Sequence, residues 1–169
     1  YESSLNQKPT GSFYTPKRIS QEITHETINH YCCNQINQKF NSQIQNLDQI
    51  FPKNSNEAQQ NLEQVKYLYN DILRHVKVCD NSCGAGEFLL SVFEYLFQLR
   101  RKCGEILAEK NEITLQQEAF EIVTTNLYGM DLQTDAIFVS RVRLWFAYLA
   151  KTSNSSKIEK NQTLFFPNL

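Results

Sequence analysis

The sequence lacks a surplus of basic residues and long apolar runs, and each absence argues against a class of binding partner. Lysine plus arginine number 17 against 18 aspartate plus glutamate, so there is no basic surplus. A protein that holds DNA alone usually carries such a surplus, because phosphate neutralisation supplies much of the affinity. We therefore expect weak or no DNA binding by this chain by itself. Apolar runs of transmembrane length, roughly 20 residues, are absent as well, and we expect no membrane partner.

Methionine and paired cysteines are also scarce. The chain opens with Tyr1 and its single methionine is Met130, so we expect it to be a piece of a longer protein. The five cysteines form no paired framework, which fits a reducing compartment and a cytoplasmic location. The three histidines share no ligand spacing with these cysteines, and we expect no metal site. The cysteines are Cys32, Cys33, Cys79, Cys83 and Cys103.

Apolar residues nevertheless make up 41% of the 169 residues, enough for one globular domain with a core. Their spacing predicts helices over about 16–39, 57–74, 87–102, 114–125 and 135–151. The first would begin at Thr15-Pro16, an N-cap followed by a residue whose φ suits a helix. Its expected apolar face carries Ile19, Ile23 and Tyr31.

The helix over 87–102 is apolar nearly all round, so we expect it to be buried. Arg100 lies near its predicted end, where a cation suits the helix dipole, and Gly104 is expected to terminate it. By contrast, residues 41–56 are rich in Asn, Gln and Ser. We expect this stretch to be a loop or a poorly ordered connector.

Two short strands, over about 75–79 and 126–132, alternate with the helices. This order predicts an α/β fold with a parallel sheet and helices on its faces. Ligands in such folds bind beyond the carboxyl ends of the strands. A glycine-containing loop follows the first strand, and Asp131 ends the second, so both fall where a ligand would bind.

The residues at these strand ends are suited to binding a nucleoside. Gly84 and Gly86 lack a Cβ, which lets the backbone turn sharply and approach a ligand closely. A carboxylate at Asp131 can accept hydrogen bonds from both ribose hydroxyls, each worth roughly 1.5–3 kcal/mol. Each feature also has a plain structural interpretation, as a tight turn or as a helix-capping aspartate.

Two common nucleotide motifs are excluded. A P-loop needs G-K-[ST], which the sequence does not contain. A dinucleotide fingerprint needs a third glycine where Leu89 stands, and an acid about 20 residues further on. A pocket for S-adenosylmethionine remains.

Three segments, in the same order, resemble motifs of adenine-N6 DNA methyltransferases from restriction–modification systems. "GSFYTP" (11–16) resembles a G-x-F-Y-T-P segment. "DNSCGAGEF" (80–88) resembles the D-P-x-C-G-S-G-x-F motif, with Asn81 for proline and Ala85 for serine. "LYGMDLQTDAIFVSRVRLW" (127–145) resembles a Y-G-x-D-I-x-P motif, with Thr134 for proline. The likeness covers about residues 11–150 and is strongest to fused restriction–modification enzymes and modification subunits.

The resemblance implies a fold, a cofactor and a division of the chain. The fold would be part of a Rossmann-like class I S-adenosylmethionine-dependent methyltransferase, and the cofactor S-adenosylmethionine. Residues 1–12 would be a flexible N-terminal segment, 13–151 the cofactor-binding part of the domain, and 152–169 a truncated continuation. By position, the cofactor-binding residues would be Phe13, Tyr14, Thr15, Pro16, Asp80, Cys83, Gly84, Gly86, Phe88, Asp131 and Leu132.

The resemblance also implies that the catalytic motif is missing. In this family an N-P-P-[YF] loop holds a flipped adenine for methyl transfer, and the sequence contains none. We therefore expect no catalytic residues and no activity in this chain alone. In the full-length protein DNA would be the partner, with a possible specificity domain or subunit. Alternatives are a fragment of a protein-glutamine or RNA methyltransferase, and a non-catalytic interaction module.

Overall fold

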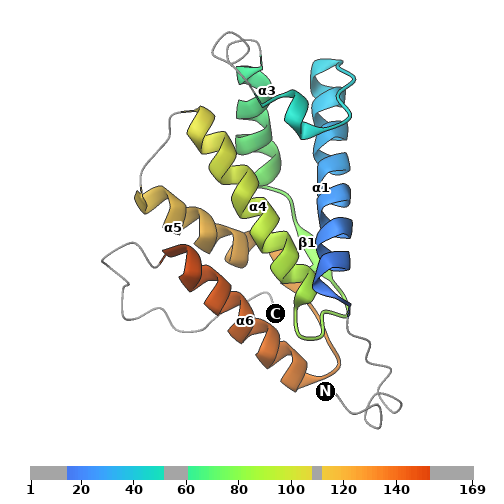
Figure 1. The fold of residues 1–169 in the computed structure, drawn as a ribbon, viewed down its shortest axis with the longest axis vertical. Helices are drawn as coiled ribbons and strands as arrows, with labels where there is room; N and C mark the ends of the chain where they lie inside the picture. Colours follow the sequence, from blue (N-terminus) through green and yellow to red (C-terminus); the bar gives the residue numbers. More distant parts are fainter. Residues whose placement is uncertain (1–14, 52–60, 108–111, 153–169) are drawn as a thin grey trace.

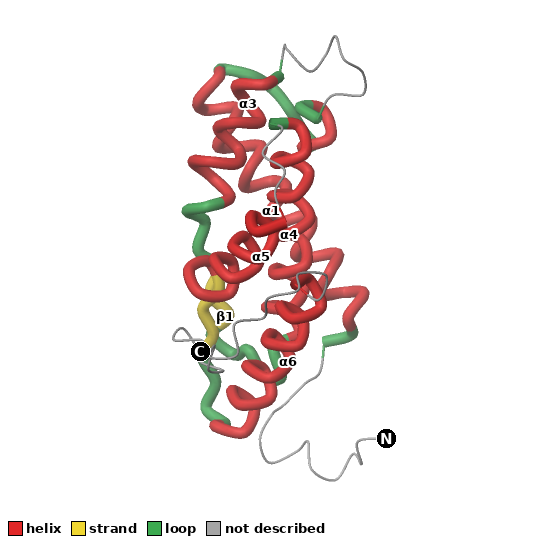
Figure 2. Tube along the Cα trace, turned by 90° about the vertical axis from the view of Figure 1, so that its left-hand side faces the viewer, coloured by secondary structure: helices red, strands yellow, loops and turns green. Residues whose placement is uncertain are grey.

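The computed structural model describes residues 15–51, 61–107 and 112–152 (Figure 1). In these residues helices predominate, and a sheet of two parallel strands lies toward one end of the molecule (Figure 2). The elements, in order, are α1 (Lys17–Phe40), the 3-10 turn η1 (Leu47–Gln49), α3 (Leu62–Tyr67), the π-helical turn η2 (Leu68–Leu73), β1 (Val78–Asp80), α4 (Glu87–Ile106), α5 (Glu112–Glu121), the π-helical turn η3 (Ile122–Asn126), β2 (Leu127–Gly129) and α6 (Thr134–Thr152). The predicted helix-rich arrangement with parallel strands is confirmed.

Helix α4 is the centre of the packing. It lies between α1 on one side and α5 and α6 on the other, and it contacts all three (Figure 1). Its buried residues include Leu89, Phe93 and Leu96, each fully enclosed. The expectation of a buried helix is therefore confirmed, but its predicted end at Gly104 is wrong. The helix continues to Ile106 because the Leu107 amide still donates to the Cys103 carbonyl, 2.9 Å away.

The two strands are shorter than the sequence suggested. Val78 pairs with Leu127 and Asp80 with Gly129, so three residues of each strand form the sheet. Strand β1 starts later than expected because the amides of residues 75 and 76 both donate to the Ile72 carbonyl and complete the preceding turn. Asp80 is thus the last residue of β1 and lies at the carboxyl edge of the sheet.

Helix α1 turns a different face to the core from the one predicted. Ile19, Ile23 and Tyr31, expected along the apolar face, are 47%, 47% and 43% exposed. The buried face carries small polar and sulfur-containing side chains together with isoleucines: Ser20, Thr24, Ile28, Cys32, Cys33 and Ile36. Ser20 is accommodated there by hydrogen bonding, since its Oγ lies 3.0 Å from Ser91 Oγ of α4, whereas the buried Thr24 hydroxyl has no hydrogen-bond partner among the described residues. The predicted Thr15 cap is also one residue early, since Pro16 occupies the N-cap position.

Residues 41–51 form an ordered loop, so of the two alternatives predicted from their polar composition, a loop is confirmed and a poorly ordered connector is wrong for these residues. The Asn37 side chain bonds both the amide and the carbonyl of Ile44, each at 2.8 Å. Gln49 and Asn46 form a capping box around η1. The amide side chains therefore satisfy the loop's backbone groups instead of leaving it unpaired. Residues 52–56, also included in that prediction, lie outside the described residues.

Within the part of the chain that the structure describes, no helix has the length and apolar character needed to cross a membrane. The same residues contain no cluster of three or more His, Cys, Asp or Glu side chains able to hold a metal ion.

Candidate functional site

The carboxyl ends of β1 and β2 are joined by backbone hydrogen bonds. The Met130 amide donates to the Asp80 carbonyl at 2.9 Å, and the Cys83 amide donates to the Met130 carbonyl at 2.9 Å. The Gly84 amide then donates to Asp131 Oδ2 at 2.8 Å. The glycine loop and the acidic strand end, 47 residues apart in sequence, thus form one continuous rim.

The Asp131 carboxylate is half-buried and takes part in this rim through both oxygens. Oδ2 accepts from Gly84, while Oδ1 accepts from the Gln133 amide at 2.9 Å. A carboxylate offers about four lone-pair positions, so these two bonds leave room for further donors. Asp131 therefore both ties the two strand ends together and keeps acceptor capacity for a ligand.

The two loop glycines have different roles. Both are in the left-handed region, with φ of +50° at Gly84 and +80° at Gly86. A Cβ on Gly84 would meet no atom within 4 Å, so this position faces open space beside the Asp131 carboxylate. A Cβ on Gly86 would overlap with Ser140 of α6. Gly86 is therefore required for the packing of α6 on the start of α4, while Gly84 leaves the loop open.

Asp80 and Cys83 stabilise the conformation of the glycine loop through local hydrogen bonds. Asp80 Oδ1 accepts from the Ser82 amide at 3.0 Å, a local turn that holds the chain as it leaves β1. Cys83 is buried, and its carbonyl accepts from the Gly86 amide at 2.7 Å. Burial raises the pKa of the Cys83 thiol, and the nearby carboxylates of Asp80 and Asp131 raise it further. The thiol is therefore kept protonated and is a packing group rather than a nucleophile.

An arginine from α6 fastens the loop. Arg143 Nη1 donates to the Ala85 carbonyl at 2.7 Å, and Nη2 donates to Glu87 Oε2 at 2.6 Å. Glu87 is the first residue of α4, so one guanidinium links the glycine loop, α4 and α6. Arg143 falls within the helix predicted over about 135–151, but the sequence identifies no partner for it. Its carboxylate partner lies 56 residues away, at the loop itself.

The remaining predicted residues are placed less tightly around the rim. Phe88 and Asp80 line a largely apolar cavity of about 310 Å³ between α1, β1 and α4. The Leu132 side chain is fully exposed next to Asp131. Thr15 and Pro16 lie at the start of α1, whose first turns reach α4 through the Ser20–Ser91 contact. Phe13 and Tyr14 lie outside the described residues.

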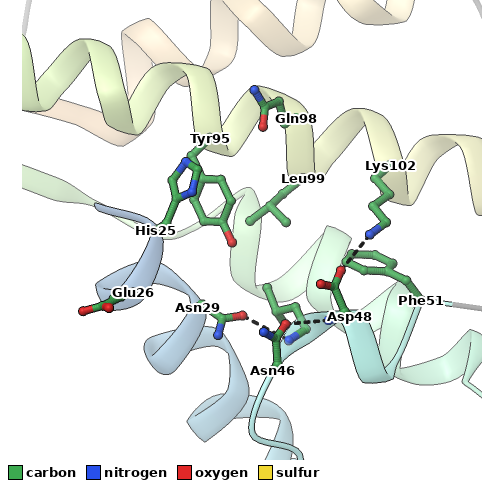
Figure 3. A pocket seen from close by; sticks show the side chains of 11 residues that line it. His25, Glu26, Asn29, Asn46, Asp48, Phe51, Tyr95, Gln98, Leu99 and Lys102 are labelled. Atoms are coloured by element: carbon green, nitrogen blue, oxygen red, sulfur yellow. Dashed lines mark hydrogen bonds and ion pairs between the residues drawn. The ribbon is translucent and has the colours of Figure 1, made fainter. Parts of the chain in front are cut away.

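A second cavity, of about 420 Å³, holds none of the predicted site residues (Figure 3). It lies between α1, the loop around η1 and the C-terminal half of α4, whereas the glycine loop precedes α4. His25 stacks on Tyr95 there, with ring centroids 4.1 Å apart. Lys102 Nζ pairs with Asp48 at 3.0 Å, and the Asn29 and Asn46 side chains accept from the backbone amides of Leu47 and Asp48.

Comparisons with known proteins place this chain in a family. Residues 53–168 match the family model described as "MmeI, DNA-methyltransferase domain". The chain belongs to this family. The whole chain also aligns with a putative type II restriction enzyme and methyltransferase from Methanocaldococcus jannaschii, with 28% identity over 181 residues. It covers 15% of that relative's length. No solved structure matches it.

The family predicted from the sequence motifs, DNA methyltransferases of restriction–modification systems, is thus confirmed. The matched region begins before β1 and includes the glycine loop, Asp131 and Arg143. The rim described above therefore lies in the methyltransferase domain of the MmeI-type family.

Proposed function

We propose that this MmeI-type chain binds S-adenosylmethionine at the carboxyl ends of β1 and β2. The observation that carries the proposal is the 2.8 Å bond between the Gly84 amide and the Asp131 carboxylate. It brings a glycine loop with open space beside it next to a carboxylate that retains lone pairs. These are the groups that a nucleoside with two ribose hydroxyls requires.

The residues present fit this cofactor. Asp131 would accept from the ribose hydroxyls with the lone pairs left by Gly84 and Gln133. The exposed Leu132 side chain would lie against the adenine ring, which replaces water over its apolar surface. The methionine end would extend along the loop formed by Asp80, Cys83, Gly84 and Gly86. Phe13, Tyr14, Thr15 and Pro16 would cover it, and Phe88 would pack behind the loop.

A Rossmann-like class I arrangement accounts for these elements. In such sheets ligands bind beyond the carboxyl ends of parallel strands, and both halves of the rim lie there. Under this proposal residues 13–151 are the cofactor-binding part of the domain.

The full-length protein would then methylate adenine N6 in DNA. The bound cofactor supplies a methyl group activated by its sulfonium. This chain's residues bind and orient that group, while a base flipped out of the duplex is presented by other parts of the protein. With a net charge of −1 and no N-P-P-[YF] motif, the chain would neither hold DNA firmly nor transfer the methyl group by itself. A specificity domain or subunit would select the sequence, in the cytoplasm.

Product analysis tests the proposed substrate. The full-length protein is incubated with methyl-labelled cofactor and one substrate at a time: duplex DNA, RNA or a glutamine-containing protein. Label recovered as N6-methyladenine from DNA supports the proposal. Label found in RNA or on glutamine would replace it with the alternative substrates, and methyl transfer by the 169-residue chain alone would show that no further motif is needed.

A further inference from the structure

A buried arginine occupies the point where both strands begin. Arg100 projects from α4 with a side chain that is 0% exposed. Its Nη1 pairs with Glu118 Oε2 at 2.6 Å. Its Nη2 donates to the Leu73 carbonyl at 2.9 Å and to Asn126 Oδ1 at 2.8 Å. A charge this deeply buried is tolerated only with such partners. Because α4 continues to Ile106, Arg100 is not in its last turn, and the predicted role of Arg100 at the helix end is wrong.

Asn126 completes a bridge between the two chain segments that enter the sheet. It is fully buried and directly precedes Leu127, the first residue of β2. Its Nδ2 donates to the Leu73 carbonyl at 3.2 Å and to the Val76 carbonyl at 2.6 Å. Both carbonyls belong to the segment leading into β1. One amide side chain therefore fixes the amino end of β2 against the amino end of β1.

Both strands are entered from a π-helical turn. Leu73 is the last residue of η2, and Asn126 is the last residue of η3. Each contacts Arg100. π-Helical turns are rare and occur frequently at functional sites. Because the last residues of both turns bind the same buried guanidinium, this contact fixes the positions at which the two strands enter the sheet.

The sheet is too small to fix this geometry by itself. Only three residue pairs join β1 and β2, and a two-stranded pair is marginal without further support. A slip of one residue would shift Asp131 by about 3.3 Å and reverse the sides on which the β2 side chains lie. The 2.8 Å bond from Gly84 to Asp131 would then be lost.

We infer that Arg100 and Asn126 are positioning residues for the cofactor site. They hold the amino ends of β1 and β2 in register, so that the Gly84 amide and the Asp131 carboxylate meet at the opposite ends. The effect on register follows from the contacts above. The effect on cofactor affinity rests on the proposed function.

The hydrogen-bonded side chains around Arg100 and Glu118 also provide a matched control. Tyr69 donates from its hydroxyl to Glu118 Oε1 at 2.5 Å, whereas Arg100 contacts the other oxygen, Oε2. Tyr69→Phe removes a buried hydrogen bond from the cluster but leaves the groups on Leu73, Val76 and Asn126 unchanged. Asn126→Leu removes the bridge while keeping a similar volume. Asn126→Asp keeps the acceptor for Arg100 but removes the two donors, and serves if the leucine variant does not fold.

The experiment measures amide hydrogen exchange in the wild-type chain and in these variants. Exchange at Gly84 and Met130 is compared with exchange at amides in the middle of α4, so that a general loss of stability cancels. In Asn126→Leu or Asn126→Asp we expect this ratio to rise about tenfold, and the cofactor dissociation constant to rise about tenfold. In Tyr69→Phe both should stay within about twofold.

An unchanged exchange ratio in both Asn126 variants would overturn the inference. So would equal ratios in the Asn126 and Tyr69 variants, because the cluster would then act only through stability. If the exchange ratio rises in the Asn126 variants but the wild-type protein binds no cofactor, the proposed function fails while the effect on register stands.

Discussion

Gly86 lies directly against Ser140. A Cβ on residue 86 would overlap with the Ser140 hydroxyl and stand 3.1 Å from its Cβ. Because Ser140 is buried and the φ of Gly86 is +80°, neither the packing nor the backbone has room for a side chain. The start of α4 and the middle of α6 are thereby held at a separation that only glycine permits.

Because only Gly86 makes this contact, substitutions of the two loop glycines should have different effects on stability. We expect Gly86→Ala to lower the free energy of unfolding by about 2–4 kcal/mol, from left-handed strain plus overpacking. Gly84→Ala should lose only the strain, about 1–2 kcal/mol, because its Cβ would face open space. Urea unfolding of both variants measures the difference. Equal losses would contradict the assigned roles.

Arg143 should matter for the glycine loop and not only for α6. Arg143→Lys keeps the charge but cannot reach the Ala85 carbonyl and the Glu87 carboxylate with one planar group. We expect a loss of about 1–2 kcal/mol in unfolding free energy and weaker cofactor binding.

Lys151→Met provides the matched control for Arg143. Lys151 is on the same helix and pairs with Glu94 at 2.6 Å, but it lies away from the loop. This variant should leave cofactor affinity within about twofold, since a partly exposed ion pair contributes little. If the Arg143 and Lys151 variants bind the cofactor equally well, Arg143 does not fasten the loop.

The buried carboxylate of Glu118 should make stability fall in acid. Burial by itself would raise its pKa, but the hydrogen bond from Tyr69, the charge and hydrogen bond of Arg100, and the hydrogen bond from Arg74 hold the pKa below the ordinary 4.5. A depressed pKa means that the stabilisation is complete above the unfolded-state pKa and is lost as the pH falls through the folded-state pKa. Glu118→Gln should therefore show a shallower decline in unfolding free energy below about pH 5 than wild type. Parallel declines in urea titrations would argue against this role.

Cysteine reactivity should follow burial. Cys79 is exposed on β1, whereas Cys83 is buried with a raised pKa. At neutral pH we expect iodoacetamide to label Cys79 well before Cys83, because the thiolate is the reactive form. Mass spectrometry of timed samples measures the order. Labelling of Cys83 at the rate of Cys79 would show that the loop opens readily.

The sequence predicted the helix-and-strand order and the convergence of the glycine loop with Asp131, because both follow from local patterns. Apolar spacing identified α4, and parallel strands necessarily bring their carboxyl ends to one edge. It failed where burial involves polar residues. Ser20 of α1 faces the core and Arg100 is enclosed, because each depends on partners distant in sequence.

The contacts that fix the strand register and those that hold the glycine loop could also not be predicted from the sequence. Nothing local to Asn126 indicates that its side chain binds the carbonyls of Leu73 and Val76. Nothing local to Arg143 identifies Ala85 as its acceptor. These contacts link segments 50 or more residues apart, so only the assembled fold specifies them.

The central claim is that Asp131 receives the ribose of a nucleoside cofactor at the rim it shares with Gly84. Calorimetric titration of the chain with S-adenosylmethionine and with its 2′-deoxy analogue tests this directly, in wild type, in Asp131→Ala and in the exposed control Asp135→Ala. The account predicts that wild type and the control prefer the natural cofactor by about tenfold or more, and that Asp131→Ala binds both ligands weakly and equally. Undiminished preference for the ribose hydroxyl in Asp131→Ala would contradict it.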